Sequence, residues 1–286
     1  MATQAVSVLR PWLTSSPAPM KSYIICGTPR SGTTLLCEAL LLTGVAGRPS
    51  EYFQAWSTRK DDRPAPGSED LKSLLADGTT PNGVFGAKIM WTHFHRTLSD
   101  LRAITGDSGA PPHQALATIF PGLRYIKTLR RDNVRQAVSL SKAVQSNHWA
   151  DLGPLADEPA KSQWIHELAL MSPFFDRQLT NTLAGSRQSA ELRYDFKQLA
   201  GFLRTIQEHD AAWTRYFAEA GITPHTVVYE DLADNYDETV LATLDYLEID
   251  RPPPSARPRI MRRQSDALND EWTARLVSDL ADSGVA

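Results

Sequence analysis

Short runs of apolar residues along the chain predict four buried β-strands. They occupy residues 22–27, 82–91, 123–129 and 225–232, and they contain many of the β-branched and aromatic residues that strands favour. Between them, apolar residues recur every three to four positions, which is typical of amphipathic helices; the predicted helices cover 32–43, 92–104, 132–147, 236–247 and most of 161–220. Strands that alternate with helices indicate an α/β fold, with a central parallel sheet flanked by helices and a C-terminal half rich in helix.

The two ends of this pattern suggest one domain preceded by an arm. Residues 1–21 lack the pattern, so we expect a loosely ordered N-terminal arm there and a single domain over 22–286. Arg10-Pro11 interrupts the short apolar run near the start, which is unlike a secretory signal. No apolar run approaches the ~18 residues that a membrane span requires. The polar, proline-rich stretch 57–70 predicts a surface loop.

Composition and charge narrow the classes of partner. The chain has 286 residues, of which 42% are hydrophobic and 22% charged, and these values are ordinary for a globular protein. A net charge of −3 means that the chain lacks the overall positive charge typical of proteins that bind nucleic acid, so we expect no nucleic acid as a partner. Cys26 and Cys37 suit a reduced, cytoplasmic protein and lack the spacing of metal ligands, so we expect no metal.

The stretch ICGTPRSGTTLL, residues 25–36, joins the first predicted strand to the first predicted helix. Gly27 and Gly32 have the spacing of the phosphate-binding motif G-x-x-x-x-G-K-[ST], but Thr33 stands where that motif has lysine. Loop N–H groups at a helix N-terminus bind anionic oxygens. The loop residues that we expect to contact a phosphate-bearing ligand are Thr28, Pro29, Arg30, Ser31, Gly32, Thr33 and Thr34.

The missing lysine argues against a nucleoside triphosphate. ATP-using enzymes of this type need that lysine and Mg²⁺ on the β- and γ-phosphates, and the sequence lacks a clear apolar strand that ends in a Mg²⁺-binding aspartate. A transferred sulfuryl group carries one negative charge, so fewer cations suffice. Arg30 inside the loop supplies a fixed cation.

These residues resemble the 5′-phosphosulfate loop of sulfotransferases that use 3′-phosphoadenosine 5′-phosphosulfate (PAPS). The segments GVAGRPSEYFQ (44–54) and PNGVFGAKIMW (81–91) are similar to those of the bacterial trehalose 2-sulfotransferase type, and RRQSD and DEW near the C-terminus also fit. The resemblance implies a P-loop-like sulfotransferase fold and a homodimer. It also implies PAPS as donor, with 3′-phosphoadenosine 5′-phosphate (PAP) as product, and a hydroxyl of a trehalose-like sugar or glycoside as acceptor.

PAPS differs from other adenine nucleotides by its 3′-phosphate. In the superfamily this phosphate is bound by an arginine at a strand end and by a serine eight or nine residues later. Ser139 follows Arg131 by eight and Arg130 by nine residues; the branch resembled uses nine, which favours Arg130, and the doubled arginine leaves the choice open. The branch also has an Arg-Gln pair that maps to Arg263 and Gln264, and we expect these residues to contact the nucleotide.

Sulfuryl transfer to an alcohol requires a base that removes the hydroxyl proton. In the branch resembled, the glutamate of EFFQ is that base, and it maps to Glu51 of EYFQ. Lys88, at the end of a predicted strand, is expected to stabilise developing negative charge. The residues expected to bind the acceptor are Tyr52, Phe53, Gln54 and Trp91. A tyrosine at position 52, where the family pattern has phenylalanine, leaves the identity of the acceptor open.

Two alternatives to a carbohydrate sulfotransferase remain open at this stage. One is a P-loop nucleotide kinase-like enzyme with an altered lysine, and the other is a non-catalytic regulator that binds PAP. Among the weaker signals, His93 and His95 suggest a helix face more than a metal site, and we interpret Tyr229, Glu230 and Asp231 as structural.

Overall fold

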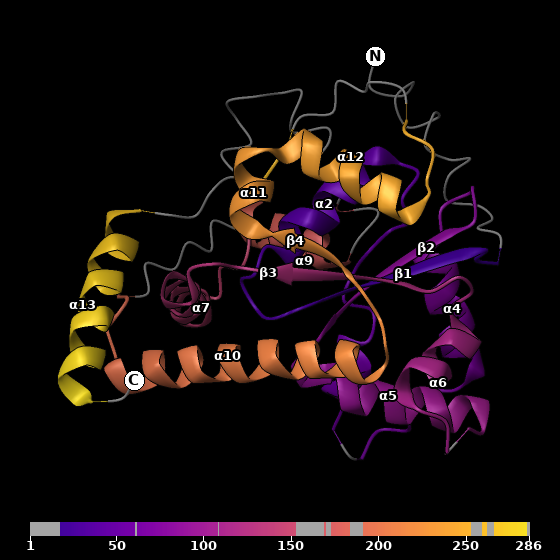
Figure 1. Cartoon of the computed structure of the whole chain (residues 1–286), viewed down its shortest axis with the longest axis horizontal. Helices are drawn as coiled ribbons and strands as arrows, with labels where there is room; N and C mark the ends of the chain where they lie inside the picture. Colours follow the sequence, from indigo (N-terminus) through magenta and orange to yellow (C-terminus); the bar gives the residue numbers. More distant parts are fainter. Residues whose placement is uncertain are drawn as a thin grey trace.

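A parallel β-sheet forms the centre of the molecule (Figure 1). The structure is a computed structural model that describes residues 18–60, 62–107, 109–152, 169, 173–183, 191–252, 259–261 and 266–284. Within these residues the sheet has four strands in the order β2-β1-β3-β4; their bounds are Lys21–Gly27 for β1, Val84–Met90 for β2, Arg124–Leu129 for β3 and His225–Val228 for β4. The predicted α/β class, with a parallel sheet flanked by helices, is confirmed.

The register of the sheet brings all four strand ends to one edge. Gly27 at the end of β1 pairs with Met90 at the end of β2, and Leu129 at the end of β3 pairs with Val228 at the end of β4. The segments that leave these ends therefore meet in space although they are far apart in the sequence. In open parallel sheets this carboxyl edge is where ligands bind.

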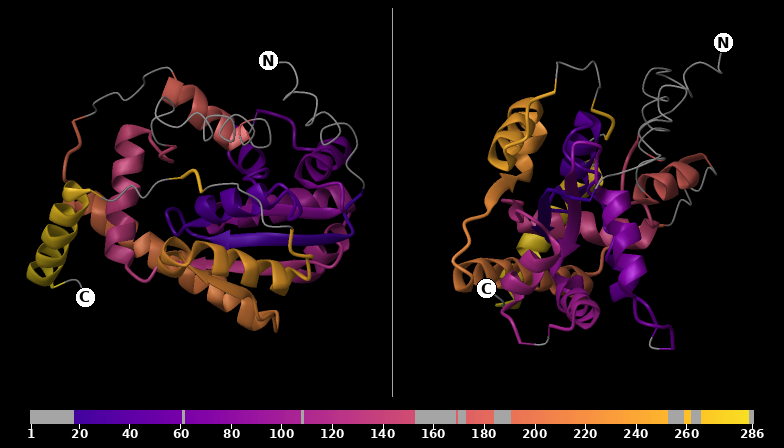
Figure 2. Two further views of the ribbon diagram at one scale, coloured as in Figure 1. Left: turned by 90° about the horizontal axis from the view of Figure 1, so that it is seen from above. Right: turned by 90° about the vertical axis from the view of Figure 1, so that its right-hand side faces the viewer.

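Helices cover both faces of the sheet (Figures 1 and 2). Alternate residues of β1 enter the two cores, as the period of a strand requires: Ile24 and Cys26 pack into one core, and Tyr23 and Ile25 into the other. The first core is completed by α4 (Ser68–Gly78), α5 (Trp91–Thr105), α6 (Pro112–Ile119) and α10 (Phe196–Glu219). The second is completed by α2 (Thr33–Thr43) and α12 (Tyr236–Leu247).

The remaining helices surround the carboxyl edge of the sheet. The helices α7 (Asn133–Ser146) and α13 (Ala267–Ser283) pack on each other and on α10, and α9 (Pro173–Leu183) packs on α2. Two short helices, α3 (Gln54–Ser57) and α11 (Tyr229–Asp234), lie near the ends of the strands. Their positions decide which side chains can reach a ligand at this edge.

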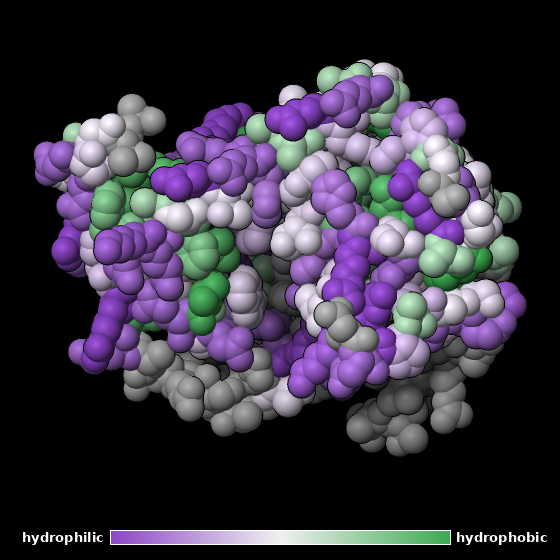
Figure 3. Space-filling view, turned by 90° about the horizontal axis from the view of Figure 1, so that it is seen from below, coloured by the Kyte–Doolittle hydropathy of each residue, from purple (hydrophilic) through white to green (hydrophobic). Residues whose placement is uncertain are grey.

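The outer face of α5 and α10 is mostly hydrophilic, with smaller hydrophobic areas (Figure 3). This agrees with the amphipathic pattern of α10, whose buried residues are Leu199, Leu203, Ile206, Trp213, Tyr216 and Phe217. In the described part of the chain, no helix combines the length and the apolar character that crossing a membrane would need.

Several element boundaries differ from the predictions. The strand predicted over 225–232 was wrong in its second half, because α11 begins at Tyr229 and its acidic first turn, Glu230 and Asp231, suits a helix N-terminus. Residues 191–195 are not helical, and the helices α3, α4, α6 and α13 were not predicted. Lys21 belongs to β1 and not to the predicted arm. The division into an arm and one domain stays a prediction.

Candidate active site

A cavity of about 720 Å³ opens at the carboxyl edge of the sheet. Its walls come from the loop after β1, the start of α2, the chain around α3, the end of β2, and parts of α5, α7, α9 and α11. The residues predicted for the site that line this cavity are Pro29, Arg30, Gly32, Thr33, Thr34, Glu51, Tyr52, Gln54, Lys88, Arg130 and Ser139. The structure therefore brings together residues that are up to about a hundred positions apart.

The loop between β1 and α2 is built on two left-handed residues. Arg30 has a φ of 66° and Gly32 a φ of 90°, and left-handed residues in a turn let successive N–H groups converge on an anion. A Cβ at Gly32 would also lie 3.0 Å from the ring of Tyr229. Glycine is thus required at position 32 by both the backbone conformation and the space available.

Two loop residues support the loop from behind. Thr28 and Ser31 are buried and do not line the cavity. Ser31 Oγ donates to the carbonyl oxygen of Thr28 at 2.8 Å, and Gln136 Nε2 donates to Thr28 Oγ1 and to the carbonyl oxygen of Pro29, each at 2.8 Å. Their side chains shape the loop, so the predicted ligand contact of Thr28 and Ser31 would have to come from the backbone.

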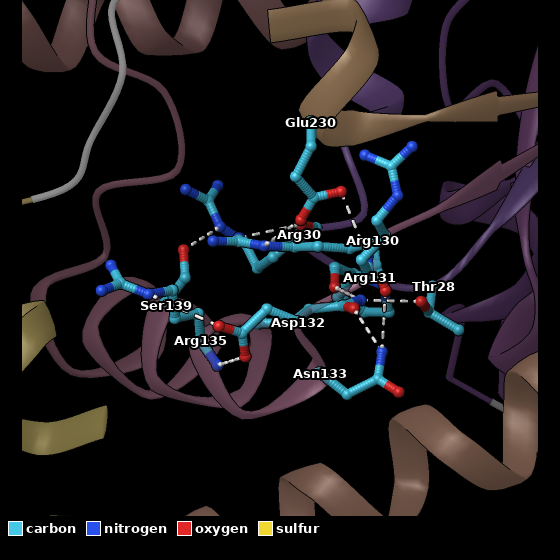
Figure 4. Close-up of polar contacts among 11 residues, drawn as sticks. Thr28, Arg30, Arg130, Arg131, Asp132, Asn133, Arg135, Ser139 and Glu230 are labelled. Carbon is cyan, nitrogen blue, oxygen red and sulfur yellow. Dashed lines mark hydrogen bonds and ion pairs between the residues drawn. The ribbon is translucent and has the colours of Figure 1, made fainter. Parts of the chain in front are cut away.

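Arg30 and Ser139 both line the cavity, and their side chains contact each other (Figure 4). Arg30 Nε donates to Ser139 Oγ at 3.0 Å, and Nη1 donates to the carbonyl oxygen of Trp149 at 2.5 Å. Burial, together with the neighbouring Arg130, lowers the pKa of Arg30 to about 10. The guanidinium remains a cation at neutral pH, and it is held where α7 meets the loop.

Arg130 and Arg131 point to different surroundings. The Arg130 guanidinium lies over the ring of Tyr229, 4.6 Å from its centroid, and lines the cavity. Arg131 is exposed, does not line the cavity, and donates from Nη2 to both carboxylate oxygens of Asp231 at 2.9 and 2.7 Å. Of the two arginines that the sequence left open, only Arg130 is in position to meet a ligand in this cavity.

One hydrogen-bond donor of the Arg130 side chain has no acceptor within the described part of the chain. Its Nε is buried without a hydrogen-bond partner, and the oxygen Oε1 of Glu230 lies 4.0 Å away. Burial lowers the pKa of Arg130, because the cation is withdrawn from water. Arg30 and Arg130 are neighbouring guanidiniums at the cavity, and the carboxylates near Arg130 are those of Glu230, at 4.0 Å, and Asp132. The two cations suit an anionic ligand.

Glu51 reaches the cavity because the chain returns beside β2. Ser50 forms a parallel bridge with Ala87, and the backbone N–H of Lys88 donates to the carbonyl oxygen of Ser50 at 2.9 Å. Lys88 Nζ then lies 3.3 Å from Glu51 Oε1 and 3.2 Å from Thr34 Oγ1. The Lys88 side chain is 4% exposed and that of Glu51 16%. One buried ammonium therefore connects the candidate base to the phosphate loop.

The aromatic residues predicted to bind the acceptor divide into two groups. Tyr52 lines the cavity, and its hydroxyl donates to the carbonyl oxygen of Arg48 at 2.6 Å. Phe53 is 1% exposed and belongs to the core. Trp91 begins α5 and packs against that core; its ring lies 4.9 Å from the ring of Trp213, and it does not line the cavity. The structure thus brings Tyr52 and Gln54 to the cavity, and places Phe53 and Trp91 behind its wall.

Several residues that line the cavity were not predicted as site residues. Tyr229 was interpreted as structural, yet it lines the cavity; its position directly after β4, at the same edge as Gly27, was a usable signal. No local signal marked the other unpredicted lining residues, which include Trp149, Arg177, Arg259 and Met261. Arg263 and Gln264 lie outside the described residues. The described residues contain no group of three or more side chains suited to hold a metal.

Comparisons with known proteins show which proteins this chain is similar to. A trehalose 2-sulfotransferase of Mycobacterium tuberculosis is 28% identical over 284 residues, covering 90% of this chain and 94% of the relative. A trehalose 2-sulfotransferase of Mycolicibacterium smegmatis is 26% identical over 294 residues, covering 92% and 97%. The model of the Stf0 sulphotransferase family matches residues 22–163 and 176–279, which include the phosphate loop, Glu51, Lys88 and Arg130. The chain belongs to the Stf0 sulphotransferase family.

Proposed function

We propose that this protein transfers a sulfuryl group from PAPS to a hydroxyl of a trehalose-like sugar or glycoside, with Glu51 as the general base. The observation that carries the proposal is the position of Lys88 Nζ, 3.3 Å from Glu51 and 3.2 Å from Thr34. This contact supports the proposal because the Glu51 carboxylate lies close to the loop that would hold a phosphosulfate. The names of the two relatives support a sugar as the acceptor.

The cavity residues fit the two anionic ends of PAPS. The left-handed turn at Arg30 and Gly32, with the hydroxyls of Thr33 and Thr34, suits the 5′-phosphosulfate. Arg130, whose buried Nε has no hydrogen bond within the described chain, suits the 3′-phosphate together with Ser139. Such charge-assisted bonds to a phosphate are among the stronger hydrogen bonds in proteins.

In the proposed reaction, Glu51 and Lys88 have different roles. When bound, PAPS supplies the sulfuryl group, whose S–O bond to the 5′-phosphate breaks as the acceptor oxygen bonds to sulfur. Glu51 accepts the proton of the acceptor hydroxyl, which makes that oxygen a better nucleophile. Lys88, which contacts both Glu51 and Thr34, is placed to donate to oxygens that gain negative charge. Its burial strengthens this electrostatic contribution, because water screens it poorly there.

Replacement of Glu51 by glutamine tests the proposed base. Glu51→Gln keeps the shape of the side chain and removes the proton acceptor, so we expect kcat for sulfation of trehalose or a related sugar to fall by about 10²- to 10⁴-fold. The Kd for PAP, measured by calorimetry, should change by less than about threefold. Glu271→Gln, at an exposed position of α13 outside the cavity, is the matched control and should keep full activity.

The outcomes separate the proposal from its alternatives. If the unaltered protein transfers radiolabelled sulfate from PAPS to no sugar but binds PAP tightly, it is a PAP-binding regulator. Equal affinity for PAP and ADP, with activity that depends on Mg²⁺, would point to a nucleotide kinase-like enzyme. If Glu51→Gln retains the full rate of sulfation, the function stands and the base assignment is wrong.

Three further properties follow from the family resemblance and stay predictions. We propose a homodimer, activity without a metal, and a cytoplasmic location. Light scattering of the purified protein measures the oligomeric state, activity after treatment with a chelator tests the metal, and fractionation of the source cells tests the location.

A further inference from the structure

The cavity wall next to Glu51 is made of α3 and the start of α5, which pack on each other. The single turn α3 is tied to α5 by Arg59, whose Nη2 donates to Asp100 Oδ1 at 2.7 Å, and by Ser57, whose Oγ lies 2.8 Å from Nδ1 of His93. The Arg59 and Asp100 side chains are 15% and 6% exposed. This partly buried two-point link holds together the wall against which an acceptor would rest.

This wall presents polar side chains to the cavity. Its lining residues are Gln54, Ala55, Thr58, Thr92 and His93. The sequence suggests a helix face more than a metal site for His93, and the proposed mechanism does not use it. His93 lines the same cavity as Glu51. Among the described contacts, it is also the one lining residue of this wall whose side chain links α3 to α5.

The contacts of Ser57 favour one tautomer of His93. The Ser57 hydroxyl has one hydrogen, which it donates to the carbonyl oxygen of Gln54 at 3.0 Å. With that hydrogen engaged, the same oxygen is available to accept from Nδ1–H of His93, and in this neutral tautomer Nε2 carries the lone pair. In the described part of the chain, Nε2 has no hydrogen-bond partner. The ring thus keeps one acceptor atom unused.

Its surroundings keep the imidazole neutral. Burial lowers the pKa of His93, and the nearby Glu51 carboxylate opposes this only in part. At neutral pH the ring therefore acts as a hydrogen-bond acceptor at Nε2 and not as a cation. An acceptor atom suits the hydroxyl group of a sugar, which has a hydrogen to donate.

We propose that His93 is an acceptor-recognising residue, whose Nε2 accepts a hydrogen bond from a second hydroxyl of the sugar while Glu51 receives the proton of the reacting hydroxyl. The inference rests on the proposed function and narrows its substrate class. A preferred acceptor carries at least two hydroxyls close together, as in a sugar, and a simple monoalcohol lacks the group that His93 binds.

Two conservative variants separate this role from a structural one. The amide of asparagine can replace the Nδ1 of histidine, so His93→Asn keeps the bond to Ser57 and loses the atom at Nε2. Glutamine reaches the position of Nε2, so His93→Gln keeps an acceptor there and weakens the bond to Ser57. If His93 only ties α3 to α5, asparagine should be the better substitute; if Nε2 binds the sugar, glutamine should be.

The experiment compares KM values for the acceptor and for PAPS, with trehalose as the first sugar and a panel of sugars after it. For the best sugar, His93→Asn should raise the acceptor KM by about 3- to 10-fold, the effect of one lost hydrogen bond, and His93→Gln should raise it less. The KM for PAPS and the Kd for PAP should stay within about twofold. His95→Ala, at an exposed position of the same helix outside the cavity, is the control and should change none of these values.

Each result decides between the two proposals. Sulfation with an unchanged acceptor KM in His93→Asn, or a better substitution by asparagine than by glutamine, overturns the role of His93 and leaves the proposed function intact. Transfer to no sugar by the unaltered protein overturns both. A rate with a monoalcohol equal to that with the best sugar would contradict the requirement for a second hydroxyl.

Discussion

Replacing Glu38 by glutamine should remove a pH-dependent loss of stability that this residue causes. Glu38 lies in α2 and is fully buried. Its Oε1 accepts from the backbone N–H groups of Ile260 and Met261 at 2.5 and 3.1 Å. Arg259 and Met261 line the cavity, so this buried carboxylate holds a distant segment against the cavity wall.

The pKa of Glu38 gives the sign and the size of the effect. Burial raises the pKa from 4.5 to about 7, although the two backbone N–H groups and Arg259 act in the opposite direction. Because the folded pKa lies above the unfolded one, the stability that this residue contributes is fully present below the unfolded pKa and is lost as the pH rises through the folded pKa. The difference of about 2.5 between the two pKa values corresponds to about 3 kcal/mol. About 2 kcal/mol of this loss falls between about pH 5.5 and about pH 8.

The assay is urea unfolding of the unaltered protein and of Glu38→Gln at several pH values across this range. Other ionisable groups contribute equally to both proteins, so the difference between their unfolding free energies isolates Glu38. We expect that difference to move by about 2 kcal/mol in favour of the variant as the pH rises from about 5.5 to about 8. Glu271→Gln, an exposed glutamate on α13, should show no such movement.

Parallel pH profiles for Glu38→Gln and the unaltered protein would refute this reasoning, because they would mean that Glu38 titrates alike in the folded and unfolded states.

Two further predictions concern the phosphate loop and the nucleotide. Arg130→Ala should weaken PAP binding by about 10- to 100-fold, the effect of losing a charged hydrogen bond, and should leave the affinity for 5′-AMP nearly unchanged. Arg131→Ala, which removes an exposed pair with Asp231, is the control. An equal loss of PAP affinity in both variants, measured by calorimetry, would contradict the assignment of Arg130. Gly32→Ala should lower the free energy of unfolding by about 1–3 kcal/mol, because φ is 90° and the new Cβ meets Tyr229 at 3.0 Å. Gly201→Ala in α10, where an added Cβ would meet no atom from outside its own stretch of helix within 4 Å, should instead raise the free energy of unfolding by up to about 1 kcal/mol. If urea unfolding showed the same change for the two glycine variants, the backbone conformation and the contact with Tyr229 would not explain the effect at Gly32.

Local patterns in the sequence were sufficient for the elements that depend on neighbouring residues. The strand, glycine turn and helix around residues 25–36 form a motif within one short segment, and the structure has β1 and α2 there. The helix predicted over 236–247 matches α12 at both ends. Where two local signals competed, the prediction failed: apolar residues before and at Tyr229 suggested a longer strand, but the acidic turn that follows starts α11.

The direction of individual side chains could not be read from local patterns. Arg130 and Arg131 are adjacent and chemically alike, yet only Arg130 faces the cavity, because its neighbour pairs with Asp231. Trp91 has the type of side chain that stacks on sugars, but it begins α5 and is drawn into the core by contact with Trp213. Burial of a large aromatic ring stabilises the fold by itself, so residue type does not reveal which use a tryptophan serves.

By itself, the sequence determined the α/β class, the glycine loop between β1 and α2, and the identity of the residues that resemble a sulfotransferase site, because each can be read from residue patterns along the chain. The tertiary structure alone decided that Lys88 joins Glu51 to Thr34, that His93 lies on the same cavity, and that Glu38 holds the segment near Met261. These contacts join residues that are tens to hundreds of positions apart. The packing of the helices around the edge of the sheet creates them, and no local pattern encodes that packing.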